Sequence, residues 1–273
     1  MDMPTDLVKP PVAERQAQRR AEQLRALRIV SYNVHWCRGL DRRIRPDRIA
    51  RVLRELDADI IGLQEVLSFQ SRSPRDDQAR YLAEQLAYQH YFVGGNRERG
   101  GGTFGNVIFS RLPILNARNH DISCGTFERR GCLRADIEIS DGRLLHVFNL
   151  HLGLRAGERH QQARMLLGKQ ILRREDVTGA RIVLGDFNEW RRGAATRLLS
   201  QEFQAVNMRR MLLRGGFPAL LPILHLDNIY YDPPLRMQNF RIHRSRTALI
   251  ASDHLPVVVE FALGGPELGT DLK

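Results

Sequence analysis

Short apolar runs alternate with amphipathic stretches along most of this chain. Residues 28–34 and 58–64 are rich in β-branched and other apolar side chains, which predicts buried strands. Between them, apolar residues recur at helical spacing from Ile49 to Leu56, which predicts a helix over 46–57. The same reasoning predicts helices at 77–88, 158–173 and 193–200, and strands around 90–94, 104–110, 132–139, 143–152, 181–184, 225–231, 238–243 and 255–262.

Two strand–helix segments flank a long stretch rich in strands. This mixture favours an α/β (α+β) protein with mixed β-sheets over a regular array of parallel βαβ units. Residues 97–103 contain three consecutive glycines and predict a flexible loop, and these glycines match neither a dinucleotide-binding nor a Walker motif. We expect a polar N-terminal extension over 1–27, partly disordered or helical, one domain over 28–265 and a C-terminal tail over 266–273.

The chain is strongly basic. It has 42 Lys and Arg against 31 Asp and Glu, a formal net charge of +11 and a pI of about 10.4. This charge favours polyanionic partners such as nucleic acid, an anionic lipid surface or phosphorylated metabolites. However, all but three of the basic residues are arginine, a skew that genome composition also produces.

Arginines are concentrated near the C-terminal end of the expected domain. Residues 205–250 contain seven arginines and two aspartates, a net charge of +5. Such a segment follows a nucleic-acid backbone, lies on an anionic membrane surface or simply forms a solvated face. The seven arginines are Arg209, Arg210, Arg214, Arg236, Arg241, Arg244 and Arg246.

Cysteine usage and hydropathy indicate the compartment. The three cysteines have no ligand-like spacing, which argues for a reducing environment without a disulfide framework. The first 28 residues contain no apolar signal core, and no stretch approaches the roughly 20 apolar residues of a membrane span. We expect a cytoplasmic, monomeric protein without a transmembrane segment.

Acidic and amide side chains stand beside the predicted strands. Glu65 directly follows the run 58–64, and Asn33 ends the first strand. A buried carboxylate is costly unless it is paired or binds a metal. A carboxylate and an amide oxygen are hard ligands suited to Mg²⁺, which keeps several waters and shares phosphate oxygens. The alternative is that both are satisfied polar groups of the core.

Further polar groups follow the later strands. Asp186 and Asn188 lie two residues apart, so on an extended segment both face the same way and can orient a water, unless they only cap a tight turn. His254 offers an imidazole for proton transfer, and Asp227 on another strand is placed to fix its tautomer. His151 is a second candidate imidazole. Together these signals predict one active site built from strand ends.

The order of these motifs resembles the endonuclease/exonuclease/phosphatase superfamily, whose fold is that of deoxyribonuclease I. The resemblance runs from about Arg28 to Leu263. It implies a four-layer sandwich of two packed mixed β-sheets flanked by helices, and cleavage of phosphoester bonds with Mg²⁺ or Mn²⁺. The matching residues are Asn33, Gln64-Glu65, Asn149-x-His151, Gly185-Asp186-Phe187-Asn188, Asp227 and Ser252-Asp253-His254.

The resemblance also implies roles for individual residues. Glu65 is expected as the main metal ligand with Asn33 beside it, and Asp253 as a further ligand or a brace. The catalytic set is His254, Asp227, His151, Asp186 and Asn188.

Within that set, His254, oriented by Asp227, would act on the attacking water. Asp186 and Asn188 would orient water and phosphate, and His151 would stabilise the phosphoryl oxygens or protonate the leaving group. The division of acid and base between the two histidines stays open.

The branch within the superfamily is less specific. His151 resembles the deoxyribonuclease I and neutral sphingomyelinase branches, whereas abasic-site endonucleases usually lack it. No Pro-x-Trp-Cys-Asp-Arg segment of inositol polyphosphate 5-phosphatases is present, and the chain looks most like uncharacterised bacterial members. We expect a phosphodiesterase acting on nucleic acid or phospholipid. A small-molecule phosphomonoesterase and an inactive phosphate-binding module remain alternatives.

Overall fold

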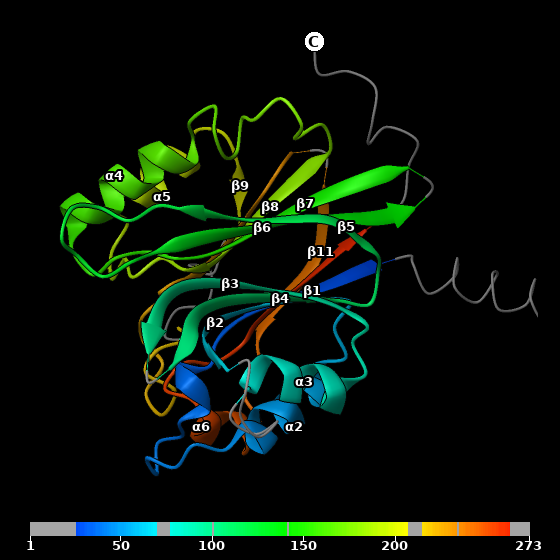
Figure 1. Ribbon diagram of the computed structural model, residues 1–273, viewed down its shortest axis with the longest axis vertical. Coiled ribbons are helices and arrows are strands. Elements are labelled where there is room, and N and C mark those ends of the chain that lie inside the picture. Colours follow the sequence, from blue (N-terminus) through cyan, green and yellow to red (C-terminus); the bar gives the residue numbers. More distant parts are fainter. Residues whose placement is uncertain are drawn as a thin grey trace, which may run out of the picture.

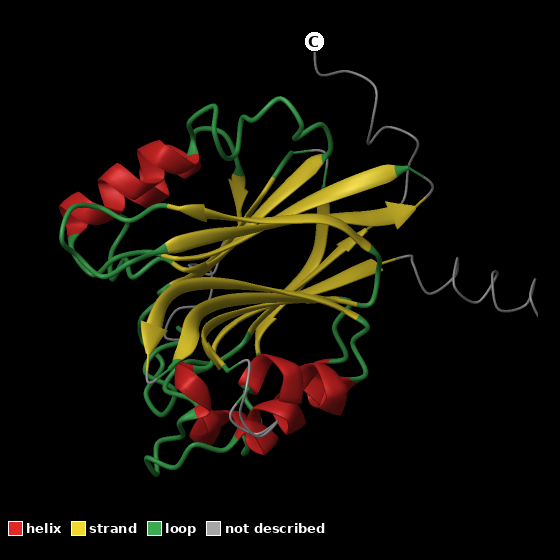
Figure 2. Cartoon of the chain, viewed as in Figure 1, coloured by secondary structure: helices red, strands yellow, loops and turns green. Residues whose placement is uncertain are grey.

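Two β-sheets packed face to face form the centre of the molecule. The computed structural model describes residues 26–69, 77–99, 101–140, 142–206, 215–233 and 235–262. Over these residues the two sheets have six strands each, and helices cover the outer face of both (Figures 1 and 2). Each sheet mixes parallel and antiparallel neighbours. The expected four-layer sandwich is therefore confirmed.

The first sheet contains both ends of the described chain, because β1 pairs with β2 on one side and with β12 on the other. Its strand order is β11 (Arg236–Ile242), β12 (Val257–Ala262), β1 (Ala26–Asn33), β2 (Ile60–Ser68), β4 (Gly102–Ser110) and β3 (His90–Arg99). The 3-10 turn η1 (His35–Cys37) follows β1, and the helices on this side are α2 (Pro46–Leu56), α3 (Gln78–Leu86) and α6 (Ala248–Ala251).

The second sheet is built from the middle of the chain. Its order is β5 (Ile114–Asp121), β6 (Gly131–Ser140), β7 (Arg143–His151), β8 (Ala180–Asp186), β10 (Asp227–Tyr231) and β9 (Gln204–Ala205). Helices α4 (Ala156–Leu166) and α5 (Ala194–Leu199) cover its outer face. Phe148 of β7, Leu166 of α4 and Leu199 of α5 share the core between that face and the helices.

Helix α2 shows how the apolar pattern produces these layers. Pro46 occupies the first turn, where its missing N–H costs nothing. Ile49, Val52 and Leu53 repeat at helical spacing and are all buried in the main core. The helix ends at Asp57, which adopts a left-handed conformation.

Buried amides fasten the two sheets together. The Nδ2 atom of Asn149 on β7 donates to the carbonyl oxygens of Leu63 (2.8 Å) and Val107 (2.9 Å) on the facing sheet. The Nε2 atom of Gln64 donates to Asn149 Oδ1 at 2.7 Å. Gly62 lets the facing sheet pack closely here, because a Cβ there would lie 2.3 Å from a Leu184 methyl carbon and 3.2 Å from Asn149 Cγ. Asn149 and Gln64 therefore fix how the strand ends of one sheet meet those of the other.

Two expectations about secondary structure are corrected. The flexible loop expected over 97–103 is wrong, because β3 continues to Arg99 and β4 begins at Gly102, so the ladder extends almost to the turn. The helix expected over 158–173 ends at Leu166, and the N–H of Gly168 then closes a tighter turn onto Met165.

Strand β5 was not expected from the sequence. It lies at the edge of its sheet, and most of its residues are exposed or half-buried, so it lacks the apolar run that marks a buried strand. The expected N-terminal extension lies outside the described residues except for Ala26 and Leu27, which belong to β1, and the tail 266–273 lies wholly outside them. No helix of the described chain is long and apolar enough to cross a bilayer.

Candidate active site

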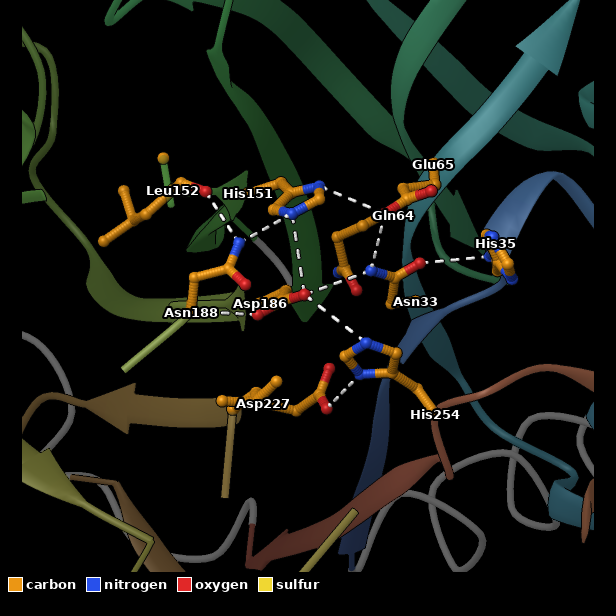
Figure 3. Close-up of polar contacts among 12 residues, drawn as sticks. Asn33, His35, Gln64, Glu65, His151, Leu152, Asp186, Asn188, Asp227 and His254 are labelled. Carbon is orange, nitrogen blue, oxygen red and sulfur yellow. Dashed lines mark hydrogen bonds and ion pairs between the residues drawn. The ribbon is translucent and has the colours of Figure 1, made fainter. Parts of the chain in front are cut away.

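Strand register gathers the predicted polar residues at one end of the sandwich. On the second sheet, His151 pairs with Asp186 across β7 and β8, and Asp227 pairs with Asp186 across β10 and β8. On the first sheet, Asn33 pairs with Gln64 across β1 and β2. Figure 3 shows Asn33, His151 and His254 in contact with Asp186, and Asp227 in contact with His254. The structure therefore brings these predicted residues together, and their role as an active site stays a prediction.

A β-bulge turns Glu65 toward this cluster. The register of β2 against β4 shifts between Leu63 and Val66, and Glu65 takes a left-handed backbone with φ of 58°. In a regular strand Gln64 and Glu65 would face opposite sides of the sheet. The bulge instead lets Gln64 reach Asn149 while Glu65 accepts a hydrogen bond from Asn33 Nδ2 at 3.1 Å. Glu65 therefore lies inside β2, not after it.

Asp186 is the centre of the cluster. Its Oδ2 atom accepts from Asn33 Nδ2 at 3.1 Å and lies 3.5 Å from His151 Nε2 and 3.7 Å from His254 Nε2. Its Oδ1 atom accepts the backbone N–H of Asn188 at 2.9 Å. Burial raises the pKa of the Asp186 carboxyl, and these hydrogen bonds with the His254 charge only partly offset that effect. Asp186 is thus a fixed and unusually basic carboxylate.

Local backbone geometry holds the Gly185–Asn188 segment. Gly185 has φ of 143°, and a Cβ there would lie 1.9 Å from the Leu150 carbonyl oxygen, so only glycine lets β8 approach β7 this closely. Asn188 has φ of 51°, a left-handed conformation that asparagine tolerates. The segment therefore directs Asp186 and Asn188 into the same site.

His254 is held by a buried carboxylate. Its Nδ1 atom lies 2.8 Å from Asp227 Oδ2, and its ring packs 4.8 Å from the Phe217 ring centroid. Burial alone lowers the pKa of His254, but the Asp227 carboxylate, with added charge from Asp186 and Asp253, outweighs burial and raises it to about 10. Among the protein groups alone, His254 is therefore an imidazolium at neutral pH.

Asp227→Asn tests this pairing. The substitution removes the largest interaction that favours the charged ring, so the pKa of His254 should fall from about 10 toward the ordinary histidine range. In an NMR titration of the imidazole, the deprotonation step should move to lower pH. Turnover should fall by about ten- to a hundredfold, less than on removing the ring itself. An unchanged titration would show that Asp227 does not set the state of His254.

His151 has the opposite electrostatic character. Burial first, and then the nearby charges of Arg130, His254 and Arg97, hold its pKa well below the ordinary value, so it is neutral at pH 7. Asn188 Nδ2 donates both to the Leu152 carbonyl oxygen (2.9 Å) and to His151 Nε2 (3.0 Å). Because Nε2 accepts in this arrangement, the ring proton is on Nδ1, which faces Glu65 Oε1 at 3.9 Å.

The residues expected to hold a cation form an open set. Burial raises the pKa of Glu65 despite its hydrogen bond from Asn33, so this carboxylate lacks sufficient positive partners within the protein. Among the described residues, no group of three or more His, Cys, Asp or Glu side chains is arranged to enclose a metal ion. This donor set fits Mg²⁺, which binds through one or two carboxylates and keeps waters and phosphate oxygens as its other ligands.

The other two expected ligands make different contacts. The Nδ2 atom of Asn33 faces both carboxylates, and its Oδ1 atom accepts the backbone N–H of His35 at 3.0 Å. Asp253 Oδ1 lies 3.4 Å from His35 Nδ1. The roles of Asn33 and Asp253 as metal ligands stay predictions. His35 was not among the predicted site residues, although it follows Asn33 at the same spacing of two that links Asp186 and Asn188.

A cleft of about 370 Å³ opens over the cluster. Glu65, Asp186, Asn188, His151 and His254 all line it. Its remaining walls are largely aromatic and apolar, formed by Trp36, Phe104, Leu154, Trp190, Phe217 and Leu226, with three charged residues, Arg97, Glu128 and Arg130.

Two arginines in this wall share one carboxylate. Arg97 Nη1 pairs with Glu128 Oε1, and Arg130 Nη2 lies 3.0 Å from Glu128 Oε2. The guanidinium of Arg97 also stacks 4.4 Å from the Phe104 ring centroid. The trio carries a net charge of +1, which suits a phosphoryl oxygen. No sequence signal marks Arg97 and Arg130 among so many arginines, because only the fold brings them to the cleft.

The described arginines of the segment 205–250 do not line the cleft, although Phe217 and Leu226 of the same segment do. Arg209, Arg210 and Arg214 lie outside the described residues. The four described arginines of that segment are absent from the lining of the cleft, and one of them, Arg241, lies 3.5 Å from Glu260.

Comparisons with known proteins agree with this geometry. The profile of the Endonuclease/Exonuclease/phosphatase family matches residues 30–254. The uncharacterized protein YbhP of Escherichia coli K12 is 30% identical over 249 residues, which cover 87% of this chain and 97% of YbhP.

Solved structures show the same fold. An endonuclease/exonuclease/phosphatase from Beutenbergia cavernae superposes with a TM-score of 0.73 at 22% identity, covering 88% of this chain and 72% of that one. The mannosyl-6-phosphatase of Bacteroides thetaiotaomicron superposes with a TM-score of 0.68 at 21% identity, covering 87% of this chain and all of that one. With the family profile spanning most of its length, the chain belongs to the endonuclease/exonuclease/phosphatase family.

Proposed function

We propose that this protein is a divalent-metal-dependent phosphoesterase that hydrolyses phosphodiester bonds by in-line attack of water. The observation that carries the proposal is the position of Asp186 Oδ2, with His151 Nε2 at 3.5 Å and His254 Nε2 at 3.7 Å. A fixed carboxylate between a neutral and a charged imidazole, at the base of a cleft, can serve both the water and the phosphoryl group.

The opposite pKa shifts suggest the division of labour. His254, as an imidazolium, donates its Nε2 proton to a phosphoryl oxygen and stabilises the charge that develops in the transition state. Asp186, whose pKa is raised, orients the water and accepts its proton. His151 offers its Nδ1 hydrogen as a hydrogen bond to a second phosphoryl oxygen, because Nε2 accepts from Asn188. The leaving oxygen then takes its proton from solvent as its bond to phosphorus breaks. This assignment gives His254 a different role from the action on water that the resemblance implies.

Glu65 would hold the cation, and Asn33 would keep Glu65 and Asp186 at their separation. When bound there, Mg²⁺ or Mn²⁺ supplies Lewis-acid stabilisation of phosphoryl oxygen charge. The desolvated state of Glu65 supports this assignment, because a nearby cation offsets the cost of burying the carboxylate.

The shape of the cleft favours a diester. Trp36 and Phe104 come from the first sheet and its flanking turn, whereas Leu154 and Trp190 come from loops of the second sheet. The cleft therefore offers apolar contact on both sides of the position over Asp186. A diester has a substituent on each side of phosphorus and uses both walls, whereas a monoester uses one.

A phosphomonoesterase is the second candidate. The pair Arg97 and Arg130 around Glu128 leaves one net positive charge at the cleft wall, and a terminal phosphate dianion gains more from it than a diester monoanion does. The mannosyl-6-phosphatase with the same fold shows that this architecture accommodates a phosphatase.

A substrate panel separates the two candidates. With Mg²⁺ or Mn²⁺, we expect turnover of bis(p-nitrophenyl) phosphate to exceed that of p-nitrophenyl phosphate by about tenfold or more, since only the diester fills both walls. The panel should include plasmid DNA, RNA, phospholipids and inositol phosphates. Rapid hydrolysis of the monoester with every diester left intact would reject the diesterase and favour the phosphatase.

A further inference from the structure

Three large apolar side chains project from the segment that precedes β10. Leu220 is 70% exposed, Leu221 66% and Ile223 53%. They stand within five residues of one another, so they form a contiguous apolar tip instead of scattered surface positions. Exposed apolar patches of this kind lower the solubility of a protein and indicate a surface that binds an apolar partner.

The tip stands on a well-ordered base. An isolated bridge joins Phe217 to Leu224, and the N–H groups of Ile223 and Leu224 both donate to the Phe217 carbonyl oxygen, at 3.1 and 2.9 Å. Gly215 N donates to Pro222 O at 2.7 Å. The backbone is therefore fixed while Leu220 and Leu221 stay in solvent, so their exposure is built into the fold.

The base of the tip is attached to the active site. Ala219 is buried, and its N–H donates to the Asp253 carbonyl oxygen at 2.7 Å, one residue before His254. Phe217 packs on the His254 ring and lines the cleft. The apolar tip therefore stands directly beside the mouth of the cleft.

Two further exposed apolar side chains line the cleft. Leu154, 72% exposed, and Trp190, 70% exposed, both line the cleft. Each precedes exposed arginine in the sequence, Arg155 after Leu154 and the pair at 191–192 after Trp190. Apolar side chains that insert between acyl chains, next to guanidinium groups at the level of lipid phosphates, are typical of protein surfaces that bind anionic membranes.

We infer that this apolar rim, formed by Leu154, Trp190, Leu220, Leu221 and Ile223, docks on an anionic lipid bilayer and places the mouth of the cleft against the lipid headgroups. A nucleic-acid backbone would gain nothing from leucine and isoleucine at these positions, since its affinity comes from charge and from base contacts. The net charge of +11 complements an anionic surface. The rim binds the surface whatever reaction the cleft performs.

Vesicle binding in chelator tests the inference without catalysis. The wild-type chain should co-sediment with vesicles of phosphatidylglycerol and phosphatidylcholine in equal parts, and weakly with phosphatidylcholine alone. The double variant Leu220→Gln/Leu221→Gln should bind the anionic vesicles about tenfold or more weakly. Leu115→Gln is the matched control: Leu115 is 59% exposed on β5, at the end of the sheet away from the cleft, and its loss should leave binding unchanged.

Other results would overturn the inference. Equal vesicle binding by the wild type and the double variant, or no vesicle binding by either, would reject a lipid-docking rim. A rim that serves another partner would also overturn it. In that case the double variant would lose duplex DNA binding, or a concentration-dependent dimer, while its vesicle binding stayed unchanged. The unfolding midpoints of all variants are measured first, and they should match the wild type because the replaced side chains are exposed.

Discussion

Replacing His254 with alanine is expected to lower turnover of a soluble aryl phosphodiester by about a thousandfold or more. The substitution removes the imidazolium that Asp227 orients at 2.8 Å and that lies 3.7 Å from Asp186. It also leaves Asp227 buried without its positive partner, so the thermal midpoint should be measured beside the rate. Steady-state kinetics with saturating Mg²⁺ or Mn²⁺ checks the prediction.

His243→Ala is the matched control for this variant. His243 Nε2 lies 2.8 Å from Glu55 Oε2, so the two also form an imidazole–carboxylate pair. This pair joins the residue after β11 to α2 and does not line the cleft. Its loss should leave kcat nearly unchanged. If His254→Ala and His243→Ala lost activity equally, the effect would be one of stability, and the catalytic role of His254 would be wrong.

Glu65→Gln is expected to lower turnover by about a hundredfold or more, because it removes the proposed main negative ligand of the cation while keeping the shape of the side chain. The same variant should lose the rise in thermal midpoint that Mg²⁺ or Mn²⁺ gives the wild type, because a cation that binds the folded chain stabilises it. The two measurements together separate loss of the cation from loss of the reaction.

A carboxylate of equal exposure serves as its control. The side chain of Glu260 on β12 is 20% exposed, against 19% for Glu65, and it accepts from Arg28 at 2.9 Å outside the cleft. Glu260→Gln should keep both the activity and the cation-induced shift. If Glu65→Gln kept full activity, or kept the rise in thermal midpoint on adding Mg²⁺ or Mn²⁺, Glu65 would not be a ligand of the cation.

Much of the fold follows from local sequence patterns. Strands with continuous apolar runs, such as β1 and β8, and a helix with a full apolar stripe, such as α2, were predicted close to their observed bounds. Strand β5 was missed because an edge strand needs no apolar face. The hairpin around Gly101 was missed because only the pairing of Arg97 with Phe104 shows that the chain continues as a strand.

The residues of the candidate site that lie at strand termini could be predicted from the sequence. Asn33, His151 and Asp186 end their strands and Asp227 begins β10, and strand register brings the four together. A polar residue at either end of an apolar run is visible in the sequence. The position of Glu65 within β2 was not predictable, because a bulge depends on the partner strand.

The charged part of the cleft wall could not be predicted. Arg97, Glu128 and Arg130 come from separate loops and strands, and their grouping depends on how the two sheets stack. Conversely, Gln64 and Asn149 stand in motifs of the family, yet their side chains join the two sheets and do not line the cleft. A match to a family motif therefore predicts the place of these two side chains in the fold, but it does not predict a role in the reaction.

The most direct test of metal-dependent phosphodiester hydrolysis is an isotope assay in ¹⁸O-labelled water. Chelator-treated protein is incubated with bis(p-nitrophenyl) phosphate before and after Mg²⁺ or Mn²⁺ is restored. The mass of the phosphomonoester product is then measured by mass spectrometry. Water attack on phosphorus predicts no product in chelator and, with metal, a product that carries one ¹⁸O atom on phosphorus. An undiminished rate in chelator, or a product without ¹⁸O, would contradict the account.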